Sequence, residues 1–157
     1  ESDKNKNNFF ENITSSQKYI DNLLTNYSKS IDKLLEKNIK LIIIYPIPEF
    51  NVNPGSVFYH KIKLKRKNII SKEYTVFIDY EKYKDWNSYA LNFYNSIKHS
   101  NIYKVDPSRV FCNNFIPKKC VANDKDYLFY YDDNHLSLEG SKIVNDLILK
   151  QIVEFTN

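Results

Sequence analysis

A short apolar run at residues 40–45 limits the folds that are open to this chain. The run is continuous and rich in β-branched residues, and Pro46 and Pro48 follow it directly. Such a run is typical of a strand that is buried on both faces of a parallel sheet. The prolines would end the strand, because proline cannot donate a ladder hydrogen bond. The sequence therefore predicts a buried strand at residues 40–45.

Segments with helical periodicity lie on both sides of this strand. Ser15 and Ser16 give a helix start, and apolar residues then recur at steps of three and four until about Asn38. A second periodic segment covers residues 80–99. Residues 57–78 have no clear period, although polar and apolar side chains alternate within them as in a half-exposed strand, and we predict that they are irregular.

The C-terminal part of the chain repeats the order of strand and helix. Residues 102–105 form a short strand pattern, and Asp106-Pro107 then turns the chain. Ser137 is the predicted cap of the last helix, with Gly140 in its first turn. The apolar face of that helix comprises Ile143, Val144, Leu147, Ile148, Ile152 and Val153.

This order of elements predicts an α/β fold with a parallel sheet. Two parallel strands are too few to form a stable sheet alone, so we expect further strands N-terminal to residue 1. Residues 1–157 are predicted to be a single domain, or most of one, with a flexible tail at residues 1–14.

The composition supports a packed core and excludes several classes of protein. Aromatic residues make up 15% of the chain, so they supply much of the buried surface. Gly55 and Gly140 are the only glycines, which argues against a P-loop or a dinucleotide-binding fingerprint. No apolar run is long enough to span a membrane and no signal peptide opens the chain. Because the chain begins with Glu, we interpret it as a processed or excised piece. The net charge of +4 permits an acidic partner without requiring one.

Cys112 and Cys120 are the only cysteines, and they lie close together in a polar, loop-like stretch. A zinc site would need further ligands nearby, and no residues have that spacing. Of the two remaining alternatives, a disulfide is favoured over a pair of reduced thiols. A disulfide would stabilise the chain by about 2–3 kcal/mol in the chain-entropy model, and it would place the domain outside the cytoplasm.

The strongest candidates for catalysis are Asp132 and His135, just before the last helix. In a turn, residues three apart can point to one side, so the carboxylate can orient one ring nitrogen and direct the other toward a nucleophile. The imidazole would then act as a general base toward a serine from elsewhere. The alternative is that these acidic residues only suit the positive end of the helix.

The sequence around this pair resembles the last conserved block of the SGNH/GDSL esterases and acyltransferases. The segment Asp132-Asp133-Asn134-His135-Leu136-Ser137, followed by Gly140, is similar to that block in SGNH domains fused behind acyltransferase-three membrane proteins. Residues 41–49 resemble that group's strand ending in a Pro-x-Pro turn. Residues 105–107 and the cysteine pair resemble its next strand, turn and paired cysteines, and order and spacing agree from about residue 17 to residue 150.

The resemblance implies a three-layer α/β/α, flavodoxin-like fold and a Ser-His-Asp triad in which Asp132 orients His135. It also implies a nucleophilic serine on a Gly-Asp-Ser turn, and oxyanion donors from a Gly and an Asn, in blocks that precede the matched part. This sequence contains no Gly-Asp-Ser. We therefore expect the chain to be the C-terminal portion of such a domain, and to be inactive without an upstream serine.

The function implied by the resemblance is acyl transfer or acyl-ester hydrolysis on a bacterial cell-envelope polysaccharide, with O-acetylation as the expected reaction. The implied partners are an acyl donor, the glycan and an upstream membrane acyltransferase domain of the same polypeptide. That domain would tether the chain on the periplasmic or cell-surface side. No cofactor, metal or nucleic acid is expected. The alternative is a catalytically degenerate domain that keeps the fold and binds a glycan or a protein.

Other candidate residues have simpler explanations. The basic run at residues 61–67 fits a solvated edge better than a nucleic-acid site, because few aromatic residues accompany it. An anionic polysaccharide or a lipid headgroup is a further alternative for this run. His60 and His99 have no evident charged partner. Trp86 and the aromatic residues around it are predicted to be core rather than a sugar-binding platform.

Overall fold

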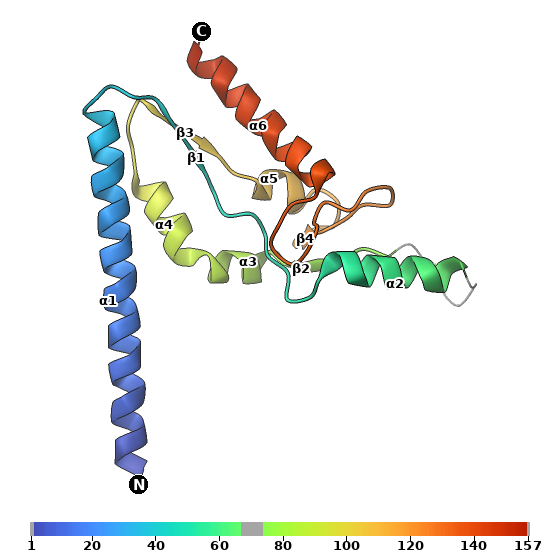
Figure 1. Cartoon of the computed structure of the whole chain (residues 1–157), viewed down its shortest axis with the longest axis horizontal. Helices are drawn as coiled ribbons and strands as arrows, with labels where there is room; N and C mark the ends of the chain where they lie inside the picture. The colour runs from blue at the N-terminus through green and yellow to red at the C-terminus, as the bar shows by residue number, and fades with distance from the viewer. Residues whose placement is uncertain (1, 67–73, 157) are drawn as a thin grey trace. The chain divides into compact units, whose positions relative to one another are not determined.

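The computed structural model describes residues 2–66 and 74–156, and Figure 1 shows the order of the elements along the chain. The chain divides into two compact units, Glu1–Leu41 and Ile42–Asn157. That residues 1–157 form a single domain stays a prediction.

Helix α1 (Ser2–Leu35) makes up most of the first unit. The sequence pattern placed its start near Ser15, whereas residues 2–14, for which a flexible tail was predicted, are helical in the structure. After the helix, Asn38 has a φ of 57°, in the left-handed region that Asn tolerates better than most residues. The predicted helix end near Asn38 is therefore confirmed.

A two-stranded parallel sheet occupies the positions that the sequence predicted, but the predicted burial of its first strand is wrong, because Leu41, Ile42 and Ile43 are only partly buried and Ile44 is 45% exposed. It pairs β1 (Leu41–Ile44) with β3 (Ile102–Val105), and Figure 1 shows the two strands side by side. The Tyr45 N–H extends the pairing by donating to the Val105 carbonyl at 2.9 Å. The predicted α/β class, with a parallel sheet and helices, is confirmed.

A second sheet was not predicted. Strands β2 (Phe77–Asp79) and β4 (Lys119–Val121) pair antiparallel, with Ile78 opposite Cys120. Ile78 is buried on this sheet, as are Cys120 and Val121. Each strand has only three residues, which is too short to show a period of two in the sequence.

Helix α2 (Pro54–Arg66) corrects the prediction that residues 57–78 are irregular. Asn53 caps the helix, because its side-chain oxygen accepts a hydrogen bond from the Ser56 N–H at 2.9 Å. Pro54 suits the first helical position, where no backbone donor is needed. Residues 67–73 of the same stretch lie outside the described residues.

The helix predicted at residues 80–99 is divided in two. Helix α3 (Tyr80–Trp86) is followed by α4 (Ser88–Ser96), and Asn87 between them has a φ of −102° and a ψ of 11°. The Asn87 side-chain amide donates to the Tyr83 carbonyl at 2.9 Å and so satisfies a carbonyl at the end of α3.

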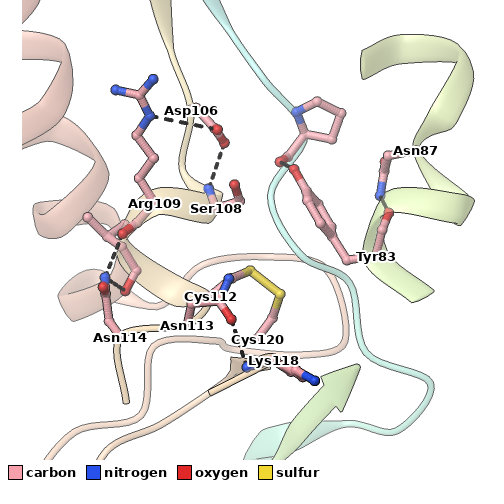
Figure 2. The surroundings of a disulfide bond; sticks show 12 residues. Tyr83, Asn87, Asp106, Ser108, Arg109, Cys112, Asn113, Asn114, Lys118 and Cys120 are labelled. Atoms are coloured by element: carbon pink, nitrogen blue, oxygen red, sulfur yellow. Dashed lines mark hydrogen bonds and ion pairs between the residues drawn. A yellow bond between two sulfur atoms is a disulfide. The ribbon is translucent and has the colours of Figure 1, made fainter. Parts of the chain in front are cut away.

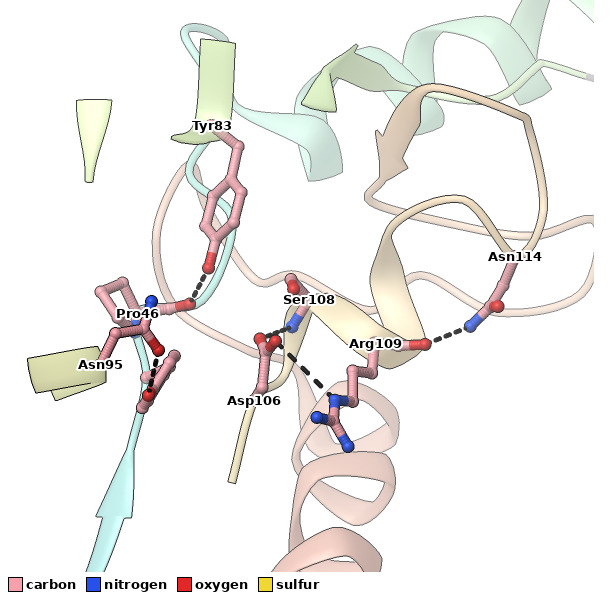
Figure 3. Close-up of polar contacts among 8 residues, drawn as sticks. Pro46, Tyr83, Asn95, Asp106, Ser108, Arg109 and Asn114 are labelled. Atoms are coloured by element: carbon pink, nitrogen blue, oxygen red, sulfur yellow. Dashed lines mark hydrogen bonds and ion pairs between the residues drawn. The ribbon is translucent and has the colours of Figure 1, made fainter. Parts of the chain in front are cut away.

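Polar contacts fix the segments that follow the two parallel strands (Figure 3). The Tyr83 hydroxyl donates to the Pro46 carbonyl at 2.9 Å, directly after β1. Burial raises the pKa of this phenol well above its usual value, so the hydroxyl stays protonated and able to donate. After β3, the Asp106 carboxylate accepts from the Ser108 N–H at 2.9 Å and helps to start α5 (Ser108–Phe111).

The core of the second unit forms around a disulfide between Cys112 and Cys120, the pairing that the sequence favoured (Figure 2). The connecting loop is tied at its base, where the Asn113 side-chain oxygen accepts from the Lys118 N–H at 2.7 Å. Both of these residues have positive φ angles, of 62° and 61°. The buried hydrophobic cluster around the disulfide includes Phe50, Val76, Ile78, Tyr83, Phe111, Val121, Ala122, Phe129, Tyr130 and Val144.

Helix α6 (Leu138–Thr156) begins at the predicted place, with Ser137 as its cap. The Ser137 hydroxyl oxygen accepts from the Gly140 N–H at 3.2 Å, and the hydroxyl donates to the Leu128 carbonyl at 2.6 Å. A Cβ added at Gly140 would lie 2.1 Å from the carbonyl oxygen of Phe129. Only glycine allows this approach, so the first turn of α6 is fixed against the backbone before the Asp132 turn.

We predict that Gly140→Ala destabilises the chain by about 3 kcal/mol, because the added methyl group would press on the Phe129 backbone. Helix propensity alone predicts the opposite sign, a gain of about 1 kcal/mol. Urea unfolding measured by circular dichroism gives the difference in free energy. Ser141→Ala, at the next position, is the control and should change stability by less than about 0.5 kcal/mol. A Gly140→Ala chain as stable as the wild type would contradict the close approach.

The disulfide gives a second prediction. Thiol titration of the denatured, unreduced chain should find no free thiol, because Cys112 and Cys120 are bonded. Replacing both cysteines by serine should lower the free energy of unfolding by about 2–3 kcal/mol, since the unfolded chain then gains the entropy of an open loop. Two titratable thiols in the unreduced chain would show that the bond does not form.

Candidate active site

Backbone contacts close both ends of the turn that carries Asp132 and His135. Tyr130 and Leu136 form an antiparallel bridge, and the Tyr131 N–H donates to the His135 carbonyl at 2.8 Å. The residues between these contacts therefore form the tip of a short loop directly before α6.

The Asp132 carboxylate organises this tip. Its Oδ1 accepts from the Asn134 N–H at 3.0 Å and from the His135 N–H at 2.8 Å. The imidazole Nδ1 of His135 lies 3.0 Å from Oδ1 and 2.9 Å from Oδ2 of the same carboxylate. One side chain thus holds both the backbone of the turn and the ring of the histidine. The sequence prediction that Asp132 and His135 point to one side of a turn agrees with this geometry.

The contact between the carboxylate and the ring fixes which nitrogen of His135 is basic. An ionised carboxylate only accepts hydrogen bonds, so Nδ1 must carry the proton that it donates to Asp132. Nε2 then has the lone pair and lies on the opposite edge of the ring. The His135 side chain is 74% exposed and that of Asp132 28% exposed, so the ring stands at the surface. The arrangement can accept a proton at Nε2 while Asp132 stabilises the resulting imidazolium.

Hydrogen bonds also lower the pKa of the Asp132 carboxyl below its ordinary value. The largest contribution comes from the Asn134 N–H, and the ring and backbone of His135 add to it. Each of these donors favours the charged form of the carboxylate. Asp132 is therefore ionised at neutral pH, as the orientation of His135 requires.

Two other segments hold the turn from outside. The Phe50 N–H, in the segment after β1, donates to the Asp133 carbonyl at 2.8 Å. A Cβ added at Gly55, at the start of α2, would lie 3.2 Å from the Tyr131 carbonyl oxygen. The turn is therefore in contact with the segment that follows β1 and with the start of α2. The sequence did not reveal these contacts, because they involve backbone groups.

Asp133 differs from its neighbour in its surroundings. Its backbone carbonyl holds Phe50, and no hydrogen bond from its side chain to His135 is present in the described residues. Neither acidic residue caps the last helix, since Ser137 has that role. The alternative that Asp132 and Asp133 merely suit a helix end therefore has little support in the geometry.

Other residues considered in the sequence are elsewhere. His60 and His99 are exposed, and the His99 ring nitrogen accepts from the Asn101 N–H at 3.0 Å. Tyr83 belongs to the core, but Trp86 is 49% exposed with the Lys82 ammonium 4.5 Å from its ring centre. The prediction that Trp86 and the aromatic residues around it are core is thus right for Tyr83 and wrong for Trp86 and for Tyr89, which is 51% exposed. Among residues 2–66 and 74–156, no cluster of three His, Cys, Asp or Glu side chains could hold a metal.

A protein-family model matches most of the chain. The family model described as the SGNH domain fused to AT3 domains matches residues 2–150. The chain belongs to this family. No curated protein and no solved structure gives a significant match.

The family assignment confirms the resemblance that was stated from the Asp132 block, and it covers nearly the whole sequence. SGNH domains are hydrolase- or acyltransferase-like, and this is the general role that the assignment supports. Within the part of the SGNH domain that the structure describes, no helix has the length and apolar composition needed to cross a bilayer.

We predict that the Asp132 carboxyl titrates below its ordinary pKa of 3.8 in the folded SGNH domain. Because the folded value is below the unfolded one, the stability contributed by Asp132 is present above about pH 4 and is lost as the pH falls through the folded pKa. Carboxyl-carbon NMR during an acid titration measures the midpoint. His135→Ala should raise it only part of the way, since the Asn134 N–H remains. A wild-type midpoint at or above 3.8 would show that the turn does not hold the carboxylate as described.

Proposed function

We propose that the SGNH domain transfers or hydrolyses an acyl ester, with His135 as the general base and Asp132 as the residue that orients it. One observation carries the proposal. The Nδ1 of His135 lies within hydrogen-bond distance of both Asp132 oxygens, and the opposite ring edge stands at an exposed surface. This is the relation between base and acid in a Ser-His-Asp triad, which is recognised by geometry and roles.

The proposed reaction assigns one role to each residue. Nε2 of His135 takes the proton from a serine hydroxyl as the serine oxygen attacks the ester carbonyl. Asp132 stabilises the imidazolium, which then returns the proton to the departing alkoxide. In the second half, a water or an acceptor hydroxyl gives its proton to Nε2 and takes the acyl group from the serine, and Nε2 then returns this proton to the departing serine oxygen. The serine and the oxyanion donors would come from blocks ahead of the matched part, because this sequence contains no Gly-Asp-Ser.

The proposed substrate is an O-acyl group, with acetyl the expected one, on a bacterial cell-envelope polysaccharide. The fusion of the family's SGNH domains to AT3 domains supports this proposal, since it suggests an acyltransferase domain on the same polypeptide. The proposed location is outside the cytoplasm, on the periplasmic or cell-surface side. The Cys112–Cys120 disulfide is compatible with it, because such bonds persist in oxidising compartments.

A second function remains in competition with this one. It is a degenerate SGNH domain that keeps the fold and binds a glycan or a protein, and an upstream segment without a serine block would favour it. The two proposals differ in what His135 does. A binding module needs no base at this position, whereas the enzyme depends on it.

We predict that His135→Ala abolishes hydrolysis of p-nitrophenyl acetate in a polypeptide that carries a Gly-Asp-Ser block ahead of this chain. Asp132→Asn should lower the rate by about 10³–10⁴-fold, because an amide can hold the imidazole in the wrong tautomer. The measurement is initial rate, with circular dichroism to show that each variant keeps the fold.

Asp133→Asn is the matched control. It removes the neighbouring negative charge but leaves the backbone contact to Phe50, so the rate should change by less than about threefold. A role through the helix dipole alone predicts equally small effects at both positions. If Asp133 is the sensitive residue, or if neither is, the triad assignment is wrong.

A further inference from the structure

A separate cavity of about 270 Å³ lies between α6 and the loop that follows β4. Neither Asp132 nor His135 lines it. Its walls combine three aromatic side chains with three carboxylates and one ammonium group. The cavity therefore sets carboxylates beside aromatic rings.

One wall is a face of α6. Glu139, Lys142, Ile143 and Asp146 line the cavity, and their steps of three and four place them on one side of the helix. The Lys142 ammonium already pairs with the Glu139 carboxylate at 2.7 Å. Asp146 has no ion-pair or hydrogen-bond partner among the residues that the structure describes. This wall therefore presents a carboxylate whose charge is not neutralised by a neighbour.

The opposite wall is a loop with a fixed shape. The Asp124 Oδ1 accepts from the Asp126 N–H at 2.7 Å and from the Tyr127 N–H at 2.6 Å. The base of the loop is closed by an antiparallel bridge between Asn123 and Leu128, and the Asn123 side chain is fully buried. Because the loop is held at both its tip and its base, the backbone of Tyr127 is fixed at the edge of the cavity.

Aromatic side chains form the apolar part of the cavity. Phe115 is 47% exposed and Tyr127 54% exposed, whereas Phe129 is buried, with its ring centre 5.6 Å from that of Phe115. Aromatic faces carry partial negative charge, which attracts a cation placed over them. Rings and carboxylates therefore favour the same kind of ligand.

We propose that this cavity binds a small organic cation through an alkylammonium group. Three carboxylates against one ammonium give the walls an excess of negative charge, so they repel an anion. A neutral apolar ligand would cover the carboxylates without compensating their loss of water. A bare metal ion has too few converging ligands in the described part of the chain. An alkylammonium group satisfies both features, because its charge suits the carboxylates and its methyl or methylene groups suit the rings.

Choline is the probe that tests this proposal. Titration of the chain with choline chloride, followed by amide chemical shifts, should give saturable changes at the cavity residues. The neutral carbon analogue, in which a tert-butyl group replaces the trimethylammonium group, should bind at least about fivefold more weakly, since it lacks the cation–π and ionic attraction. Equal binding of the two compounds, or no saturable binding of choline, would overturn the proposal. The assay needs no ester hydrolysis, so its outcome is independent of the triad.

Two variants and one control locate the site. Asp146→Asn and Tyr127→Leu should each weaken choline binding by about three- to tenfold, because each removes one source of attraction for the cation. Asp126→Asn is the control, since this carboxylate lies in the same loop but does not line the cavity, and its effect should be below about twofold. An effect of Asp126→Asn as large as that of Asp146→Asn would mean general charge attraction, and the proposed site would be wrong.

Discussion

The second unit depends on the burial of two consecutive residues, Phe129 and Tyr130. The Phe129 carbonyl accepts from the Ser137 N–H at 2.9 Å, which fixes the start of α6. The Tyr130 ring is fully buried, with its centre 4.8 Å from that of Phe50 and 5.6 Å from that of Phe111. One stretch of chain therefore joins the segment after β1, the disulfide region and the last helix. Because the Asp132 turn follows it directly, the turn takes its position from the core.

In the candidate active site, the fold fixes the orientation of the His135 ring more than it strengthens the attraction between the ring and Asp132. The imidazole of His135 is largely exposed, and water weakens the attraction between it and Asp132. The hydrogen bonds to the Asp132 carboxylate nevertheless leave the ring few orientations. A substrate or another segment that covered the ring would exclude water and strengthen an interaction whose geometry is already set. An exposed, preorganised pair is thus compatible with a catalytic role only when a substrate or another segment covers it.

The parts of the structure that could be predicted are those with local signals. The β-branched run of β1 and the cap Ser137 act through neighbours in the sequence, and both lie where they were predicted. Strands β2 and β4 were missed because their pairing depends on residues far apart in the chain. Helix α2 was missed because its basic and apolar side chains alternate as in a strand, and this pattern outweighed the cap signal of Asn53. At the site, the spacing of Asp132 and His135 could be recognised in the sequence. The contact with Phe50 could not, because it joins backbone groups and does not depend on the type of side chain.

One local motif serves both regions to which this structure points. In each, an Asp Oδ1 accepts from the N–H groups two and three residues later: Asp132 from Asn134 and His135, and Asp124 from Asp126 and Tyr127. This carboxylate turn replaces hydrogen bonds that a sheet or helix would supply, so the chain can reverse at the surface without losing order. In both turns, the residue three positions after the Asp carries the side chain that lies at the site or the cavity. In the first turn it is an imidazole that the same carboxylate also orients, and in the second it is a phenol ring at the edge of a cavity. The carboxylates therefore act first on the backbone, and the imidazole and the phenol ring are placed as a consequence.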